Sequence, residues 1–218
     1  MSRIVEITYL GHSSFKIKGK TAVVVTDPFD EKCGKFPRDL TADIVTVSHD
    51  HFDHNATKLL SSSFFVRGPG EYEVGGVSVV GVHSWHDDKS GAERGPNTIY
   101  VIEIEGLRLV HLGDLGHKLD QEQLDEMGPI DVVMVPVGGE YTIDAKTAAE
   151  VTRQVDPWVV IPMHYQQEGL DKSAFGQLAG VGGFLAEMGK SEIQPVAKYV
   201  ITADKLPSEL QVVVLERK

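Results

Sequence analysis

The stretch from His49 to His54 constrains this chain more than any other, because its six residues read His-Asp-His-Phe-Asp-His. Three imidazoles and two carboxylates in six positions are too polar for a core segment and too rich in metal ligands for an ordinary turn. Residues 43–48, Asp-Ile-Val-Thr-Val-Ser, precede the motif and are typical of a buried strand. Residues 55–60 follow it, and their pattern predicts the start of a helix.

The spacing within this motif predicts two metal positions. Side chains two residues apart point the same way in an extended chain. If the chain stays extended past residue 48, His49 and His51 face one ion, while Asp53 and His54 follow at the turn and face a second. Two cations held by imidazole and carboxylate form a hydrolytic centre that supplies hydroxide near neutral pH. A solvated, charged loop is the alternative interpretation.

Composition narrows the class of protein. The chain has 218 residues, of which 41% are hydrophobic, and this is enough to fill a core. Its formal net charge of −11 argues against a broad nucleic-acid footprint, but metal ions still allow an anionic substrate. The single cysteine, Cys33, lies in a loop-like segment, and we expect it to be partly exposed and incidental. We find neither a secretory leader pattern nor a membrane-spanning run, so we expect a cytoplasmic protein that does not contact a membrane.

Short strands dominate the first half of the sequence. Valine-rich or alternating runs, separated by glycine and proline, predict strands, and Glu105-Gly106 predicts a hairpin between the last two. The predicted strands are residues 4–10, 14–18, 21–26, 43–48, 64–67, 71–74, 77–82, 98–105 and 107–112.

Helices alternate with strands in the second half. The predicted helices are residues 119–127, 145–154 and 173–188, and the predicted strands are residues 131–137, 158–163, 198–202 and 210–215. Helices packed on the outer faces of two sheets account for both halves. No linker, repeat or low-complexity tract interrupts the chain. We therefore predict a single α/β domain over residues 1–218.

Three further segments end predicted strands with groups that bind metals. They carry His83 and His86, then Asp114, and finally His164. Functional residues of open α/β sheets lie just past the carboxyl ends of strands. Each of these residues also has a structural interpretation. For example, Asp114 could be an ordinary turn residue, and His164 could be a hydrogen-bonded histidine at a strand end. The incomplete ligand set of residues 49–54 favours the metal-binding interpretation of all of them.

These motifs together resemble those of the metallo-β-lactamase superfamily of hydrolases. Within it, the chain is similar to the small single-domain branch that includes L-ascorbate-6-phosphate lactonase. The resemblance covers nearly the whole chain and follows the family order. The matching segments are residues 9–15, 26–28, 49–54, 84–88, 94–97, 111–114, 136–139 and 161–165.

The resemblance implies a fold, a cofactor and a ligand set. The fold is a four-layer αββα sandwich with the metals at one edge of both sheets. It implies that the first ion binds His49, His51 and His86, the second binds Asp53, His54 and His164, and Asp114 bridges them. His83 is the alternative to His86. Asp53 and Asp114 are thereby also catalytic residues. We expect two zinc ions, with manganese or iron(II) as alternatives.

Several other residues are candidates for positions around the metals. Metal-bound histidines usually donate their second ring N–H to a carboxylate or carbonyl, and aspartates near the motif could accept it. Arginine could hold a phosphate or carboxylate, although a solvated arginine is the alternative. We interpret His111 and His117 as supporting or surface residues. The candidates for orienting ligands or contacting substrate are His12, Asp27, Asp50, Arg94, Tyr141 and Tyr165.

The expected function is metal-dependent hydrolysis of a small ester, lactone or phosphodiester by a bridging hydroxide. The alternatives are an iron-dependent dioxygenase or other redox enzyme on the same scaffold, and a non-catalytic metal-binding protein. Diiron reductases of the superfamily usually carry a carboxylate where His51 stands, and a flavin domain for which 218 residues leave no room. We expect a small-molecule substrate, which can be anionic, and no nucleic-acid partner. The resemblance to the lactonase also predicts a homo-oligomer.

Overall fold

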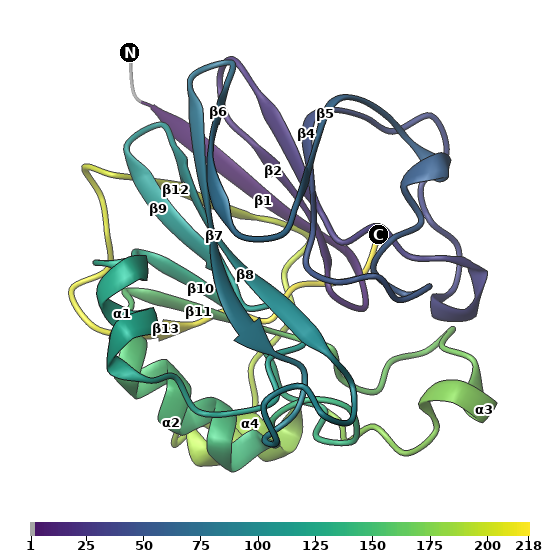
Figure 1. Ribbon diagram of the computed structural model, residues 1–218. Coiled ribbons are helices and arrows are strands. Elements are labelled where there is room, and N and C mark those ends of the chain that lie inside the picture. Colours follow the sequence, from purple (N-terminus) through teal and green to yellow (C-terminus); the bar gives the residue numbers. More distant parts are fainter. Residues whose placement is uncertain (1–2) are drawn as a thin grey trace.

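Two β-sheets pack face to face in the computed structural model, which describes residues 3–218 (Figure 1). The first sheet has the strand order β12-β1-β2-β3-β4-β5, with parallel pairing of β3 with β4 and β4 with β5. Its strands are β1 (Ile4–Gly11), β2 (Ser14–Lys18), β3 (Val23–Thr26), β4 (Thr41–Val47), β5 (Ser61–Arg67) and β12 (Tyr199–Thr202).

The second sheet has the order β13-β11-β10-β9-β8-β7-β6. Pairing is parallel from β13 to β9 and antiparallel from β9 to β6, so this sheet is also mixed. Its strands are β6 (Gly70–Val74), β7 (Val77–Trp85), β8 (Pro96–Ile104), β9 (Leu107–His111), β10 (Val132–Pro136), β11 (Val159–Met163) and β13 (Gln211–Val212).

The continuous apolar runs of the second sheet are explained by burial on both faces. In β10, Val132 and Met134 join the core between the sheets, whereas Val133 and Val135 join the core beneath the helices. All four are fully buried. A parallel strand covered on both sides has no solvent-facing positions, and its sequence therefore lacks the polar alternation of an edge hairpin.

Three helices cover the outer face of the second sheet: α1 (Gln121–Met127), α2 (Ala145–Val155) and α4 (Gly182–Glu187) (Figure 1). Aspartates begin the first two. Asp120 forms a capping box with Gln123, and Asp144 accepts a hydrogen bond from the backbone N–H of Thr147. Such caps satisfy N–H groups that the first helical turn leaves free.

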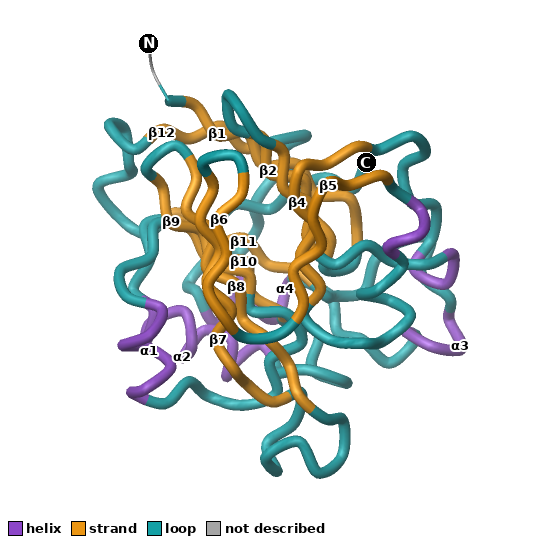
Figure 2. Tube along the Cα trace, turned by 45° about the horizontal axis from the view of Figure 1, so that its top comes forward, coloured by secondary structure: helices purple, strands orange, loops and turns teal. Residues whose placement is uncertain are grey.

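The outer face of the first sheet has a thinner cover. The 3₁₀ helix η1 (Glu31–Cys33) and the short helix α3 (Lys172–Phe175) contribute side chains to an apolar cluster there. Figure 2 shows α3 well apart from α1 and α2. Cys33 belongs to this cluster and is fully buried, so its expected partial exposure was wrong. Burial also raises the pKa of the thiol, which keeps it protonated and unreactive.

The helix predicted from residue 55 does not form. Only the 3₁₀ helix η2 (Thr57–Leu59) lies there, and no side chain caps its start at Ala56. Leu60 is already extended, and Ser61 begins β5, which pairs with β4. Parallel neighbours such as β4 and β5 are usually joined by a helix, but residues 48–54 of this connection form the turns of the histidine motif. Only residues 55–60 remain before β5 begins, which leaves little room for an α-helix.

The helix predicted over residues 173–188 is broken into α3 and α4. Between them, the backbone N–H of Ala179 donates to Gly138 O, and the N–H of Gln166 donates to Ala179 O. These backbone groups are bonded to distant parts of the chain, so they are not available for the i→i−4 hydrogen bonds of a continuous helix. Glycines at residues 176, 180, 182 and 183 weaken the helical alternative further.

The αββα architecture predicted from the sequence is confirmed, with the fourth layer reduced to η1, η2 and α3. The predicted strands form with ends shifted by a few residues, except that β13 covers only part of the predicted 210–215 run. The turn at Glu105-Gly106 joins β8 and β9 antiparallel. Within residues 3–218, no helix has the length and apolar character needed to cross a membrane.

The inter-sheet core gives a direct stability test. Ile161 is fully buried between the sheets, whereas Ile4 is 48% exposed on the outer strand pair of the first sheet. Ile161→Ala should lower the free energy of unfolding by about 2–5 kcal/mol because it leaves a cavity. Ile4→Ala should cost under about 0.5–1 kcal/mol. Denaturant titration of both variants measures the difference, and equal losses would contradict the assignment of the core.

Candidate metal centre

The ends of strands from both sheets meet at one edge of the sandwich. From the first sheet, the turns after β1, β3 and β4 reach this edge, and from the second sheet the turns after β7, β9 and β11 do so. Sequence segments more than 100 residues apart are thus brought together. The side chains that gather here are His12, Asp27, His49, His51, Asp53, His54, His86, Asp114 and His164.

One group of possible ligands contains His49, His51 and His86. The ring centroids lie 4.5 Å apart between His49 and His51, and 4.7 Å apart between His49 and His86. His49 and His86 are buried, while His51 is exposed and borders solvent. The chain bends after β4 rather than continuing as a strand, and it still places His49 and His51 side by side.

A second group contains His12, Asp53, His54 and His164, all buried. Asp53, His54 and His164 are the three residues that the family resemblance implies for the second ion. His12, which the sequence left as a candidate, donates from Nε2 to Asp53 Oδ2 over 3.1 Å. Burial, and secondly the neighbouring His164, lower the pKa of His12 to about 4. His12 is therefore placed to hold the Asp53 carboxylate.

Asp114 lies between the two groups. Its Oδ2 is 3.2 Å from the Nε2 atoms of His54, His86 and His164, and 3.9 Å from Nε2 of His49. The carboxylate is 1% exposed. Burial opposes its ionisation, but the surrounding histidines outweigh burial and lower its pKa well below the usual value. One buried oxygen thus contacts side chains of both groups.

The donor atoms at the centre fit a bound cation. Within the described residues, four of these buried atoms have no hydrogen-bond partner: Nε2 of His49, Nε2 of His54, Nε2 of His164 and Oδ1 of Asp114. Buried polar atoms are normally paired, so such a cluster needs an explanation. Burial lowers the pKa of His49, which favours the neutral imidazole that binds metals. Imidazole and carboxylate suit zinc, manganese and iron.

Asp27 orients two of these histidines. Its Oδ2 accepts from Nδ1 of His54 over 2.8 Å and from Ser48 Oγ over 2.6 Å. Ser48 Oγ in turn accepts from Nδ1 of His49 over 2.9 Å. Both histidines are thereby held with Nε2 directed at the centre, as metal ligands require. Asp50, the other aspartate proposed for this role, is exposed and accepts instead from Asn55.

The turns that carry these residues have unusual backbones. His12, Asp27 and His164 have φ angles of 53°, 38° and 51°, in the left-handed region that non-glycine residues seldom adopt. His164 is fixed by its N–H, which donates to His12 O over 2.8 Å. Strained residues of this kind cluster at functional sites, where the surrounding structure holds them in place.

The turn before Asp114 requires glycine. Gly113 has φ of 57°, and a Cβ there would lie 2.3 Å from Asn97 Oδ1 and 2.7 Å from the Cβ of Ser48. The same Asn97 oxygen accepts from the backbone N–H of Asp114 over 3.0 Å. This turn packs closely against Asn97 and Ser48, and the packing fixes the position of the Asp114 carboxylate at the centre.

His111, which was interpreted from the sequence as a supporting or surface residue, is a supporting residue. It is fully buried; its Nε2 donates to Ser13 O over 2.7 Å, and its Nδ1 accepts from the N–H of Gly113 over 3.2 Å. It therefore ties the turn of His12 in one sheet to the turn of Asp114 in the other. Only its position between a strand end and Gly-Asp hinted at such a function. His117 lies outside the cluster and bonds Trp85 N and Lys118 O.

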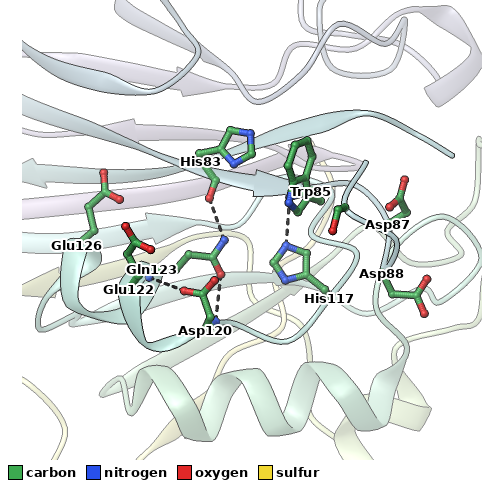
Figure 3. A pocket seen from close by; sticks show the side chains of 10 residues that line it. His83, Trp85, Asp87, Asp88, His117, Asp120, Glu122, Gln123 and Glu126 are labelled. Atoms are coloured by element: carbon green, nitrogen blue, oxygen red, sulfur yellow. Dashed lines mark hydrogen bonds between the residues drawn. The ribbon is translucent and has the colours of Figure 1, made fainter. Parts of the chain in front are cut away.

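The structure places His86, and not His83, in the cluster. His83 is exposed and packs against Trp85, with ring centroids 4.3 Å apart. Both border a pocket of about 460 Å³ on the α1 side of β7 (Figure 3). This acidic pocket is lined by five carboxylates, those of Asp87, Asp88, Asp120, Glu122 and Glu126.

Asp87 organises the loop after β7, a second role missed in the sequence. Its carboxylate accepts from the backbone N–H groups of residues 89, 91, 93 and 94. Desolvation opposes its ionisation, but these four donors outweigh it and lower the pKa below the usual range. The loop carries Arg94, whose guanidinium lies 5.8 Å from the Tyr141 ring centre. The sequence offered one signal for this role, an aspartate that directly precedes a glycine-containing loop.

The two tyrosine candidates have different surroundings. Tyr141 borders a pocket of about 450 Å³ beside His86, and its hydroxyl donates to Ala174 O over 2.6 Å. Tyr165 is 6% exposed and stacks on Tyr9, so it packs in the core. It lines neither the pocket of Tyr141 nor the pocket beside His49 and His51.

A separate pocket of about 520 Å³ opens directly beside the first ligand group. We call it the substrate-side pocket. It is bordered by Val47, Ser48, His49, Asp50, His51, Arg67, Gly68, Pro69, His83, Arg94, Pro96 and Thr98. A cavity of this volume suits a small molecule.

The choice between the two histidines of β7 can be tested directly. His86→Ala should remove most metal from the first position because a buried donor next to Asp114 is lost. His83→Ala should leave the metal content unchanged, since the exposed His83 ring packs on Trp85. Metal analysis of the two purified variants after identical zinc loading compares them. A greater loss in the His83 variant would reverse the assignment.

The orienting role of Asp27 gives a second test. Asp27→Asn should weaken metal binding about 10–100-fold, the usual effect of losing an outer partner of a ligand. Asp50→Asn, which alters an exposed carboxylate of the same motif, should change it less than about twofold. Competition with a chelating dye measures both affinities. Similar losses in the two variants would show that charge, and not the Asp27 hydrogen bonds, controls binding.

Comparison with known proteins identifies the family of the chain. Residues 6–164 match a family model described as a beta-lactamase superfamily domain. A curated UPF0173 metal-dependent hydrolase from Thermococcus onnurineus (strain NA1) is 31% identical, over 74% of this chain and 85% of that protein.

Solved structures show the same fold. A crystal structure from Thermotoga maritima, reported as that of a proposed Zn-dependent hydrolase of the metallo-beta-lactamase superfamily, is 38% identical, with a TM-score of 0.79. The match covers 98% of this chain and 100% of that one. CmlA, a diiron beta-hydroxylase from Streptomyces venezuelae, has a TM-score of 0.62 at 10% identity, over 92% of this chain and 54% of that one, a likeness of fold alone. The chain belongs to the metallo-β-lactamase superfamily, among its metal-dependent hydrolases.

Proposed function

We propose that the chain hydrolyses a small ester, lactone or phosphodiester at a dinuclear metal centre. The observation that carries this proposal is the position of Asp114 Oδ2, within 3.2 Å of three Nε2 atoms drawn from both ligand groups. His49, His51 and His86 would hold one ion. Asp53, His54 and His164 would hold the other, with Asp114 shared between them. We expect zinc, with manganese or iron(II) as alternatives.

When bound, the two ions would lower the pKa of a bridging water and polarise the substrate oxygen, so that hydroxide is available near neutral pH. The residues of the chain prepare this chemistry. Asp27 fixes the tautomer of His54 directly and that of His49 through Ser48. His12 holds the carboxylate of Asp53. Because these contacts are buried and pre-formed, the ligands need little reorganisation on binding metal.

The substrate-side pocket supports a small-molecule substrate. It lies against His49 and His51, and its volume of about 520 Å³ is in the range of small-ligand sites. The formal net charge of −11 disfavours nucleic acid as a partner. A homo-oligomer remains a prediction from the family resemblance.

An iron-dependent oxygenase is the second candidate, favoured by the fold shared with the diiron beta-hydroxylase CmlA. The hydrolase is preferred because the first ligand group consists of three imidazoles, a set that suits zinc. Oxygen consumption by the iron-loaded protein, beside hydrolysis by the zinc-loaded protein, separates the two functions.

Asp114 is the decisive residue for this proposal. Asp114→Ala should lower both metal affinity and the rate of hydrolysis by more than about a hundredfold. The loss of an outer partner of a ligand already lowers metal affinity or activity 10–100-fold, and Asp114 would itself be a ligand. The assay is turnover of a lactone, an aryl phosphodiester, a thioester and a β-lactam by protein loaded with zinc, manganese or iron(II). Wild-type turnover in the variant would contradict a bridging role for this carboxylate.

A further inference from the structure

The two ligand groups of the metal centre differ in their access to solvent. In the first group, His51 is exposed and borders the substrate-side pocket, and His86 borders the pocket of Tyr141. The members of the second group are buried and line neither of these two pockets: His12, Asp53, His54 and His164. An ion bound by the second group therefore needs another way in and out.

Two short segments cover the second group. The Phe175 ring, in α3, is 2% exposed and lies 4.9 Å from the His12 ring between centroids. The backbone N–H of Asp171 donates to Lys32 O over 2.8 Å and so joins the start of α3 to η1. Both segments lie on the side of the molecule away from α1 and α2 (Figure 1). We call η1 and residues 168–178 the cover.

The cover also contacts the histidine motif through Phe52. This ring lies 6.1 Å from the Phe175 ring between centroids, and Lys32 Nζ lies 4.6 Å from its centre. Phe52 is 45% exposed, so these contacts bury little apolar surface. Segments held by few buried contacts open at a lower free energy than the core does. The front of the cover is therefore its weakly held side.

Arg217 holds the rear of the cover. Its Nη2 donates to Cys33 O at the end of η1, and its Nη1 donates to Glu168 O over 3.1 Å ahead of α3. The guanidinium carbon lies 5.5 Å from the centre of the Phe29 ring. The planar guanidinium carries several donors in a fixed geometry, so one side chain can bind both segments at once.

The backbone of Arg217 is attached to the first sheet. It pairs with Tyr9 of β1 in a parallel bridge, and the N–H of Lys218 donates to Tyr9 O over 3.1 Å. The Tyr9 hydroxyl in turn donates to His12 O over 2.6 Å. Arg217 therefore connects the cover to the strand that leads into the second ligand group.

Three glycines make room for this arginine. At each of them, the atom nearest to an added Cβ would belong to the Arg217 side chain. The distance would be 2.7 Å to Nε at Gly11 and 3.2 Å to Nη1 at Gly169, and Gly34 would clash with Nη2. The glycines come from the end of β1, the end of η1 and the segment before α3. Glycine allows the backbone to approach this closely, and the guanidinium thus lies in a cradle of three separate segments.

We propose that the cover is a gate over the second metal position and that Arg217 is the positioning residue that holds it closed. The proposal rests on the dinuclear centre of the proposed function. The cover must lift before an ion leaves the second position, whereas the first position is open to solvent at His51. Arg217 acts through Phe175 and contacts neither the metal ligands nor the substrate-side pocket.

Release of zinc to an excess of a chelating dye, followed by stopped flow, tests the gate. The wild-type protein loaded with two zinc ions should release one in a fast phase and one in a slow phase. Arg217→Gln should accelerate the slow phase about tenfold or more, because it removes a charged group that donates to both segments. It should change the fast phase less than about twofold. Phe175→Leu removes the ring beside His12 and should accelerate the same phase.

Two control variants separate the gate from general effects. Lys218→Gln alters the exposed neighbour of Arg217 and should release zinc like the wild type. Ile161→Ala lowers global stability and should leave the ratio of the two rates unchanged. Hydrogen exchange of the metal-free Arg217→Gln protein should be faster at residues 31–34 and 168–178 and unchanged in α2. Uniformly faster exchange, or the same selective acceleration in Ile161→Ala, would show a general loss of stability and overturn the gate.

The same release experiment separates failure of the gate from failure of the dinuclear function. Two phases whose rates are unchanged in Arg217→Gln would overturn the role of Arg217, and unchanged rates in Phe175→Leu as well would overturn the gate itself. Both results leave the dinuclear hydrolase standing. A single bound ion that Arg217→Gln releases faster would support the gate and overturn the dinuclear function. A single ion released at the wild-type rate in both variants would overturn both proposals.

Discussion

The buried carboxylate of Asp114 is the constraint on which the rest of the site depends. An ionised carboxylate at 1% exposure is costly unless positive charge or donors surround it. The Nε2 atoms of His54, His86 and His164 lie 3.2 Å away, and they come from strands of both sheets. The sheets must therefore pack at one fixed distance and register for these donor atoms to meet around this oxygen. The inter-sheet core, more than any local turn, provides that register.

A shell of hydrogen bonds among the protein's own groups holds the geometry. Asp27 links β3 to the motif after β4, while His111 links the first turn of one sheet to the Asp114 turn of the other. Asn97, on β8, holds the backbone of Asp114. Each residue is fully buried and bonds to groups far away in sequence. This explains how non-glycine residues such as His12 and His164 keep left-handed φ angles at the site.

The sequence predicted those features that depend on local pattern. The valines of β10 indicate a strand buried on both faces, and the residues that approach the centre lie just past strand ends, where side chains in α/β folds reach one edge. Features set by distant partners were not predictable. The bond from Ala179 to Gly138 breaks the expected helix, and η1 and α3 bury Cys33. The role of His111 depends on Ser13, 98 positions earlier in the chain. No local signal encodes such a contact.

The carboxylates of this acidic chain lie in different kinds of surroundings. Acidic side chains are spread over the surface and gathered in the pocket beside α1, whereas the aspartates of the centre are surrounded by histidines. Asn55 separates Asp50 from Arg67, so a carboxylate and a guanidinium share one pocket without neutralising each other. The separation is achieved by a single amide that directly follows the histidine motif.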